Sequence, residues 1–171
     1  MLVLGIDPGT AITGYGLVRE EGGALSLVAC GVIRTPAEDS LPQRLAQIYN
    51  ALRRLIATYQ PAHMAVEELF FSNNARTAFA VGQARGVCLL AGIQAGLAIY
   101  EYTPLQVKQA VVGYGKASKE QVQQMVRMLL GLEDIPRPDD AADAVAIAIC
   151  HHHSARLAAL EQGLAGEPQT E

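Results

Sequence analysis

Acidic residues at three separate places in the sequence are the strongest candidates for chemistry. Asp7 follows a short apolar run, and Glu67 and Glu68 follow another. Asp140 and Asp143 lie three residues apart in PRPDDAADAVAIAI. Carboxylate oxygens are the ligands that hard divalent cations such as Mg²⁺ prefer. Two such ions can activate a water molecule and stabilise the leaving oxygen when a phosphodiester is hydrolysed. If folding gathers these carboxylates, the sequence predicts a metal-dependent phosphodiester hydrolase.

Three of these residues also have an ordinary structural interpretation. Asp7 begins an Asp-Pro-Gly turn, and Asp does this well through hydrogen bonds to its own backbone. Asp140 and Asp143 lie where a helix is expected to begin, and acidic side chains there stabilise the helix dipole by about 0.3 to 1 kcal/mol. Their spacing also places both on one helix face, so both can reach one ion. The pattern leaves both interpretations open.

Glu67 and Glu68 end an apolar run, AHMAV, that is typical of a buried strand. An acidic residue there must reach water or find a cation, because an unpaired buried charge is costly. Neighbouring residues of a strand point to opposite faces, so at most one of the two can line the same pocket. The pattern alone does not choose between them.

Two further motifs are weaker candidates. His151, His152 and His153 resemble a metal site, but consecutive helical residues project about 100° apart and do not converge on one ion. We therefore expect a solvated helix end there. The loop at 113–118, GYGKAS, lacks the GxxxxGK[ST] spacing of a phosphate loop. It still offers Lys116 as a residue that could touch nucleic acid.

The elements that position these residues alternate between two periodicities. Short apolar runs predict strands at 2–7, 13–20, 24–35, 62–66 and 97–102. Three- and four-residue apolar spacing predicts helices at 41–59, 73–96, 104–112, 118–130 and 138–160. Ser40 is the expected N-cap of the first helix. A Gly-rich turn makes the first three strands an antiparallel meander. This order predicts an α/β fold with a mixed five-stranded sheet, meander first and parallel strands after it, flanked by helices.

Size and composition indicate one compact domain. The chain has 171 residues, of which 50% are hydrophobic and 18% charged. We expect a domain over 1–160 and a disordered tail over 161–171, where the sequence loses its periodicity. No signal peptide or membrane-spanning run is visible, and the three cysteines are far apart. These features predict a cytoplasmic protein with reduced thiols.

The net charge of −4 argues against nucleic acid as a partner, because nucleic-acid-binding domains normally carry a basic surface. Bound divalent cations would offset several carboxylates, and the remaining Lys and Arg could form one basic face. Composition by itself therefore points away from DNA without excluding it.

Five motifs, in order along the chain, resemble those of the RuvC family of bacterial endonucleases that resolve Holliday junctions. They are GIDPGTAITGYG at 5–16, EELFFSNNARTA at 67–78, GQARGV at 82–87, QVKQAVVGYGKASKEQV at 106–122 and DAADAVAIAI at 140–149. The resemblance runs from about 2 to 153. It implies an RNase H-like nuclease domain.

The resemblance also implies a set of catalytic residues. Four family carboxylates bind Mg²⁺, with Mn²⁺ as an alternative and two ions per active site, and they correspond to Asp7, Glu67, Asp140 and Asp143. It thus selects Glu67 over Glu68. Family members vary at the position of Asp140, where His can replace Asp. Lys119 matches a basic residue of catalysis, and Lys108 one that contacts phosphate.

DNA contacts are implied on both sides of this set. The family carries an aromatic residue that stacks on opened bases where Phe70 and Phe71 stand, and we expect one of the two to pack in the core. A stacked base is worth about 1 to 3 kcal/mol. Asn74 and Arg76 are candidates for backbone contacts in the same segment, as is Lys116 in its loop.

The activity that follows from the resemblance is symmetric nicking of two opposed strands of a four-way junction, in DNA recombination and repair. The products would carry 5′-phosphate and 3′-hydroxyl ends. The implied partners are junction DNA, a second copy of the chain in a homodimer, and RuvA and RuvB, which drive branch migration. Two cuts related by symmetry need one twofold axis. The small residues of 75–88 suit a helix interface and suit a buried core helix equally.

Two other classes compete with this interpretation. GIDPGTAITGYG also resembles the first phosphate loop of actin-like ATPases and sugar kinases, but those proteins need two such domains and this chain has room for one. A module that binds junctions without cutting them is the other, and the complete carboxylate set argues against it.

Overall fold

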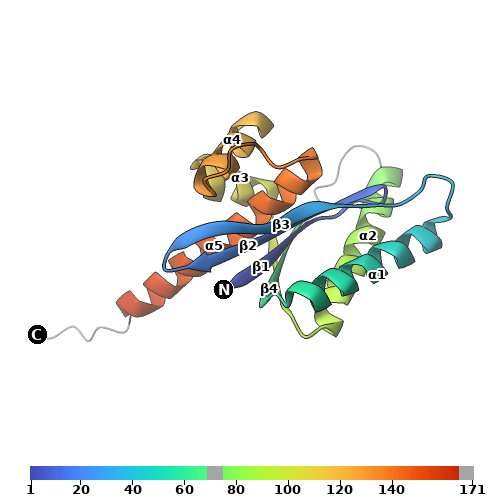
Figure 1. The fold of residues 1–171 in the computed structure, drawn as a ribbon, viewed down its shortest axis with the longest axis horizontal. Helices are drawn as coiled ribbons and strands as arrows, with labels where there is room; N and C mark the ends of the chain where they lie inside the picture. Colours follow the sequence, from blue (N-terminus) through green and yellow to red (C-terminus); the bar gives the residue numbers. More distant parts are fainter. Residues whose placement is uncertain (69–74, 166–171) are drawn as a thin grey trace, which may run out of the picture.

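The computed structural model describes residues 1–68 and 75–165, which form one five-stranded sheet with helices on both faces (Figure 1). The strand order is β3-β2-β1-β4-β5. The strands are β1 (Leu2–Asp7), β2 (Ile12–Glu21), β3 (Ala24–Arg34), β4 (His63–Glu67) and β5 (Ala98–Tyr102). β1, β2 and β3 are antiparallel neighbours, whereas β4 runs parallel to β1 and β5 parallel to β4. The predicted meander and mixed sheet are confirmed.

The helices divide between the two faces of the sheet. The five are α1 (Leu41–Tyr59), α2 (Ala75–Gln94), α3 (Pro104–Val112), α4 (Lys119–Leu129) and α5 (Asp139–Ala165). One core cluster joins α1 and α2 to one face, and a second joins α3, α4 and α5 to the other. The alternation along β1 explains this, because Leu4 and Ile6 belong to the first cluster and Val3 to the second. Figure 1 shows α5 running along the sheet with α3 and α4 beyond it.

Glycines let α5 lie directly on the sheet. A Cβ atom on Gly5 of β1 would clash with the backbone oxygen of Ala144, and one on Gly14 of β2 would clash with the backbone oxygen of Asp140. Only residues without side chains allow a helix this close to strand backbone. The first turns of α5 are therefore held over the ends of β1 and β2.

The helix ends follow their sequence signals. Ser40, Thr103 and Ser118 are N-caps, each with a Gln three residues later that completes a capping box. The Ser118 cap makes Lys119 the first residue of α4. α5 begins at Asp139 and continues to Ala165, into the segment predicted to be a tail. Within 1–68 and 75–165, every helix is too short or too polar to cross a lipid bilayer.

The three consecutive histidines were wrongly predicted to form a solvated helix end. His151 and His152 are each only 1% exposed, because α5 continues past them and presses them against the sheet. His151 Nε2 lies 2.8 Å from His63 Nδ1, and its Nδ1 lies 2.8 Å from the Tyr102 hydroxyl. His152 Nε2 lies 3.0 Å from the backbone oxygen of Val18. Polar partners on the strands thus make these buried imidazoles tolerable.

We expect His151 to make the fold sensitive to acid. Burial, together with His63 and His152, lowers the pKa of His151 to about 4 from 6.5. The unfolded chain takes up this proton near pH 6.5 and the folded protein only near pH 4, so stability is complete above pH 6.5 and falls as the pH drops toward 4. The loss is at most about 3 kcal/mol. Urea unfolding at pH 7 and pH 4.5 measures it.

A His151→Gln variant is the control for this effect, because carboxylates also titrate in that range. Its stability should fall less between pH 7 and pH 4.5 than that of the unaltered protein. Equal losses in the two proteins would contradict the role of His151.

Candidate active site

Asp7 and Glu67 meet at one edge of the sheet because β1 and β4 are parallel. Ile6 pairs with Val66, so Asp7 and Glu67 are the next residues along the two strands. Their side chains point to the α5 face, since Val3, four positions before Asp7, and Ala65, two positions before Glu67, belong to the α5 core cluster. Two carboxylates from distant parts of the sequence thus lie side by side.

Glu68 lies outside this cluster. It follows the last residue of β4, its side chain is exposed, and its backbone N–H donates to the oxygen of Tyr102 at 2.8 Å. Strand alternation allowed only one of the two glutamates to line the pocket, and in the structure that residue is Glu67.

The start of α5 brings the other two carboxylates to the same edge. Asp140 lies over Gly14, and Gly14 is the strand partner of Asp7. Asp143, one helical turn further, lines a pocket of about 270 Å³ together with Glu67. The structure therefore places all four predicted carboxylates around the carboxyl ends of β1 and β4, where ligands commonly bind in open α/β sheets.

The carboxylates repel one another in a partly buried setting. Burial raises the pKa of Asp7 to about 7, and the charges of Glu67, Asp143 and Asp140 add to the shift. Burial also raises the pKa of Glu67, with Asp143 as the next cause. Both shifts have the sign expected when desolvation and like charges disfavour ionisation. The cluster is therefore short of positive charge.

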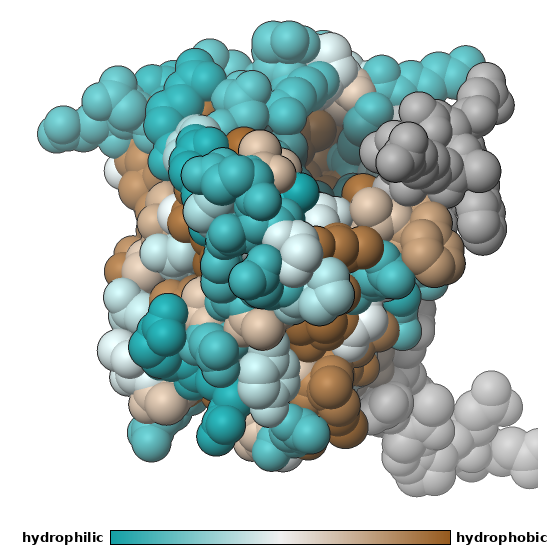
Figure 2. Space-filling model, turned by 90° about the vertical axis from the view of Figure 1, so that its right-hand side faces the viewer, coloured by the Kyte–Doolittle hydropathy of each residue, from teal (hydrophilic) through white to brown (hydrophobic). Residues whose placement is uncertain are grey.

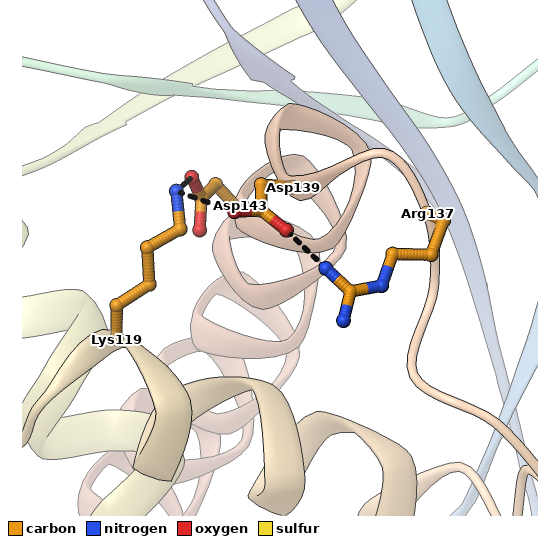
Figure 3. Close-up of polar contacts among 4 residues, drawn as sticks. All are labelled: Lys119, Arg137, Asp139 and Asp143. Atoms are coloured by element: carbon orange, nitrogen blue, oxygen red, sulfur yellow. Dashed lines mark hydrogen bonds and ion pairs between the residues drawn. The ribbon is translucent and has the colours of Figure 1, made fainter.

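Lys119 supplies part of that positive charge. Its Nζ lies 2.7 Å from Oδ2 of Asp143 and 3.9 Å from Oδ2 of Asp139. Figure 3 shows Lys119 reaching from α4 to the start of α5, with Arg137 meeting Asp139 from the other side. The hydrogen bond to Asp143 raises the pKa of Lys119, so the ammonium stays charged.

Within 1–68 and 75–165, no three His, Cys, Asp or Glu side chains are arranged to hold one metal ion in this conformation.

The predicted DNA-contact residues differ in how close they lie to the carboxylates. Lys108 lines the same pocket as Glu67 and Asp143, whereas Lys116 is exposed in the loop between α3 and α4. Arg76 lies in the first turn of α2, and the orientation of its side chain is not described. Three further predicted contacts lie outside the described residues: Phe70, Phe71 and Asn74.

Two side chains at the site were not predicted from the sequence. Asp139 pairs with both Lys119 and Arg137. Arg85 of α2 donates from Nε to the backbone oxygen of Glu67 at 3.1 Å. An arginine inside an otherwise small and apolar helical run was a signal that it has a buried partner.

Comparison with known proteins adds a family context to this geometry. The model of a family described as "Crossover junction endodeoxyribonuclease RuvC" matches residues 3–151. A protein of that name from Heliobacterium modesticaldum is 63% identical over 154 residues, which are 90% of this chain and 95% of that protein.

Solved structures agree with the family match. The Thermus thermophilus RuvC structure is 40% identical, with a TM-score of 0.87 over 92% of this chain and 97% of that one. A structure of the T. thermophilus protein in complex with Holliday junction substrate is 39% identical, with a TM-score of 0.84 over 92% and 96% of the two chains.

Proposed function

This chain belongs to the RuvC family of crossover junction endodeoxyribonucleases, and on that basis we propose that it resolves Holliday junctions by nicking two opposed strands. Its fold is RNase H-like, as the resemblance implied. The observation that carries the proposal is the meeting of Asp7, Glu67, Asp140 and Asp143 at one edge of the sheet. We further propose 5′-phosphate and 3′-hydroxyl ends on the nicked strands.

The four carboxylates suit Mg²⁺ or Mn²⁺ as cofactor, with two ions per site. All are oxygen donors, and burial together with the charges of the neighbouring carboxylates raises the pKa of Asp7, so a divalent cation would find negative charge to offset here. Ions held there would supply an activated water and polarise the scissile phosphate. Asp7 and Glu67 would hold them from the sheet, and Asp140 and Asp143 from α5.

The lysines would act on the DNA. Lys119 and Lys108 stand on α4 and α3 beside the carboxylates, where their ammonium groups can bind the oxygens of the scissile phosphate and the charge that develops there. Lys116 would contact the backbone from its loop. For Phe70, Phe71, Asn74 and Arg76 we keep the proposed roles in base stacking and backbone contact.

The experiment that tests this function is cleavage of a synthetic four-way junction with each strand labelled in turn. We expect nicks in two opposed strands with Mg²⁺ or Mn²⁺, products that DNA ligase reseals, and little cutting of linear duplex. Binding without cutting in both metals would instead favour a silent junction-binding module.

We expect Lys119→Ala to slow junction cleavage by about 10²-fold at saturating enzyme, because it removes one charged donor from the phosphate. Single-turnover rates give the effect on the chemical step. Lys116→Ala is the contrast, because this exposed loop lysine should affect junction affinity more than the saturated rate. A normal rate for Lys119→Ala would remove Lys119 from the catalytic set.

We propose that α2 forms the centre of a homodimer. Phe79, Leu90 and Ile93 are 68%, 47% and 62% exposed, and their spacing places them within about 60° of one another around the helix. Gly86 shares this face and has open space beside it, which suits close approach of a second helix. Figure 2 shows hydrophobic surface between hydrophilic stretches on the side of the molecule that carries α1 and α2. Cys88, in contrast, is buried in the core.

Sedimentation analysis should give twice the chain mass of 18.2 kDa. We expect Ile93→Asp to shift the protein to monomers and to abolish paired nicking. Met128→Asp is the matched control, since Met128 is 66% exposed but lies on α4. A dimer that survives Ile93→Asp would place the interface elsewhere.

RuvA and RuvB are the further partners that we propose for this chain, and we propose that it acts in the cytoplasm.

A further inference from the structure

Arg85 is a charged residue on the inner side of α2, and only 18% of its side chain is exposed. α2 otherwise covers the sheet with small and apolar residues, among them Ala84 and Cys88, which are fully buried. Covering a guanidinium to this extent is unfavourable unless charged or polar partners satisfy it. Its partners therefore indicate what Arg85 does.

Both partners of Arg85 lie on neighbouring strands at the edge that carries the carboxylates. Its Nε donates to the backbone oxygen of Glu67 at 3.1 Å, and its Nη2 pairs with the carboxylate of Glu101. Glu101 of β5 is the register partner of Val66 of β4. One rigid guanidinium thus ties α2 to Glu67 and Glu101, near the carboxyl ends of two parallel strands.

The bond to Glu67 acts on the backbone of a residue at the active site. β4 ends at Glu67, so its carbonyl lies where the regular ladder stops and needs another donor. Arg85 supplies that donor from the α1 and α2 side of the sheet, while the Glu67 side chain points to the opposite side, toward α5. Holding the backbone there limits the directions that the Glu67 carboxylate can take.

We propose that Arg85 is a positioning residue that fixes Glu67 for metal binding, an inference that rests on the proposed nuclease function. Arg85 touches neither substrate nor metal in this role. Ligands of a metal must be held within about 0.5 Å of their productive positions, and partners behind the ligands typically contribute 10- to 100-fold in metal affinity or activity. Arg85 would contribute on that scale.

The variants that test this are Arg85→Ala and Arg85→Lys, with Arg54→Ala as the control. Arg54 is an exposed residue of α1, so its loss removes the same charge away from the site. Mn²⁺ affinity by titration calorimetry is the first readout, and it does not depend on cleavage. Junction affinity without divalent ions and thermal unfolding without metal complete the set.

We expect both Arg85 variants to bind Mn²⁺ about 10- to 100-fold more weakly, to cleave correspondingly more slowly at limiting metal, and to bind the junction as before. Arg54→Ala should bind Mn²⁺ normally. Arg85→Lys keeps the positive charge but loses the guanidinium, whose separate nitrogens reach both strands. If Arg85→Ala does not fold, Arg85→Lys still tests the proposal.

A Glu101→Gln variant separates positioning of Glu67 from the ion pair alone. It leaves the bond from Nε to the Glu67 oxygen in place, so its Mn²⁺ affinity should fall less than that of Arg85→Lys. Unchanged Mn²⁺ affinity in folded Arg85→Lys would overturn the proposal, and so would an equal loss in Glu101→Gln. Failure of the unaltered protein to cut junctions would overturn the nuclease function instead, while the Mn²⁺ titrations would still report on Arg85.

Discussion

We expect replacement of Asp7 with Asn to abolish junction cleavage and to leave junction binding in place. The amide keeps the volume of the side chain but is a poor ligand for a divalent ion, and it stands where β1 ends beside Glu67. Ions at such sites contribute several kcal/mol to the stabilisation of the transition state. Each 1.36 kcal/mol is a tenfold change in rate, so we expect a loss of at least about 10³-fold. Single-turnover cleavage with labelled junctions measures it.

We also expect Asp7→Asn to make the metal-free protein more stable, although the substitution removes an active-site residue. Burial and three nearby carboxylates raise the pKa of Asp7 to about 7, so the folded protein holds this proton more tightly than the unfolded chain. Without metal, the stability contributed by the protonated form is present at low pH and is lost as the pH rises toward 7. Asp7→Asn removes that loss, so its melting temperature at pH 7.5 should exceed that of the unaltered protein by at least about 2 °C.

With divalent ions present, the unaltered protein should have a higher melting temperature than Asp7→Asn. Mg²⁺ binds the folded state and so raises the melting temperature of the unaltered protein, while the variant lacks one ligand and gains less. Asp134→Asn is the control, because Asp134 is exposed in the loop between α4 and α5. An Asp7→Asn protein that cuts at the normal rate would remove Asp7 from the site.

Glu67→Gln and Glu68→Gln form the second comparison, and we expect opposite outcomes. Glu67 points to the α5 face beside Asp7 and Asp143, and Glu68 is exposed beyond the end of β4. Glu67→Gln should lower the cleavage rate at least about 10²-fold, because it removes a metal ligand and leaves the backbone bond to Arg85 intact. Glu68→Gln should change the rate less than about threefold.

Mn²⁺ titration of the two variants checks the cause of this difference. Metal affinity should fall in Glu67→Gln and stay normal in Glu68→Gln. Similar losses of cleavage in both variants, or the reverse order, would mean that the strand register does not set which glutamate serves the site.

The order of elements was predictable from the sequence because short-range patterns encode it. Alternating apolar residues indicated the five strands, and three- and four-residue spacing indicated the helices, since each pattern reports which side of an element is buried. The predicted Ser40 cap was equally local. The four carboxylates were identified because they lie at element ends and match family motifs.

The sequence could not reveal which elements press together. His151 and His152 were predicted to be solvated because consecutive helical residues cannot converge on one metal ion, yet α5 lies on β1 and β2 and both imidazoles are buried there. Their partners, including His63 and Val18, are distant in the chain. Burial here is a property of packing between elements.

By itself the sequence determined the types of side chain available for metal binding, the strands and helices that carry them, and the family they resemble. The resemblance also favoured Glu67 over Glu68. The tertiary structure alone decided that Glu67 lies beside Asp7 on one face, that Gly14 brings Asp140 over β1 and β2, and that Arg85 reaches the Glu67 backbone. The reason is physical: propensity and periodicity act over a few residues, whereas strand register and helix contact join residues far apart in the chain.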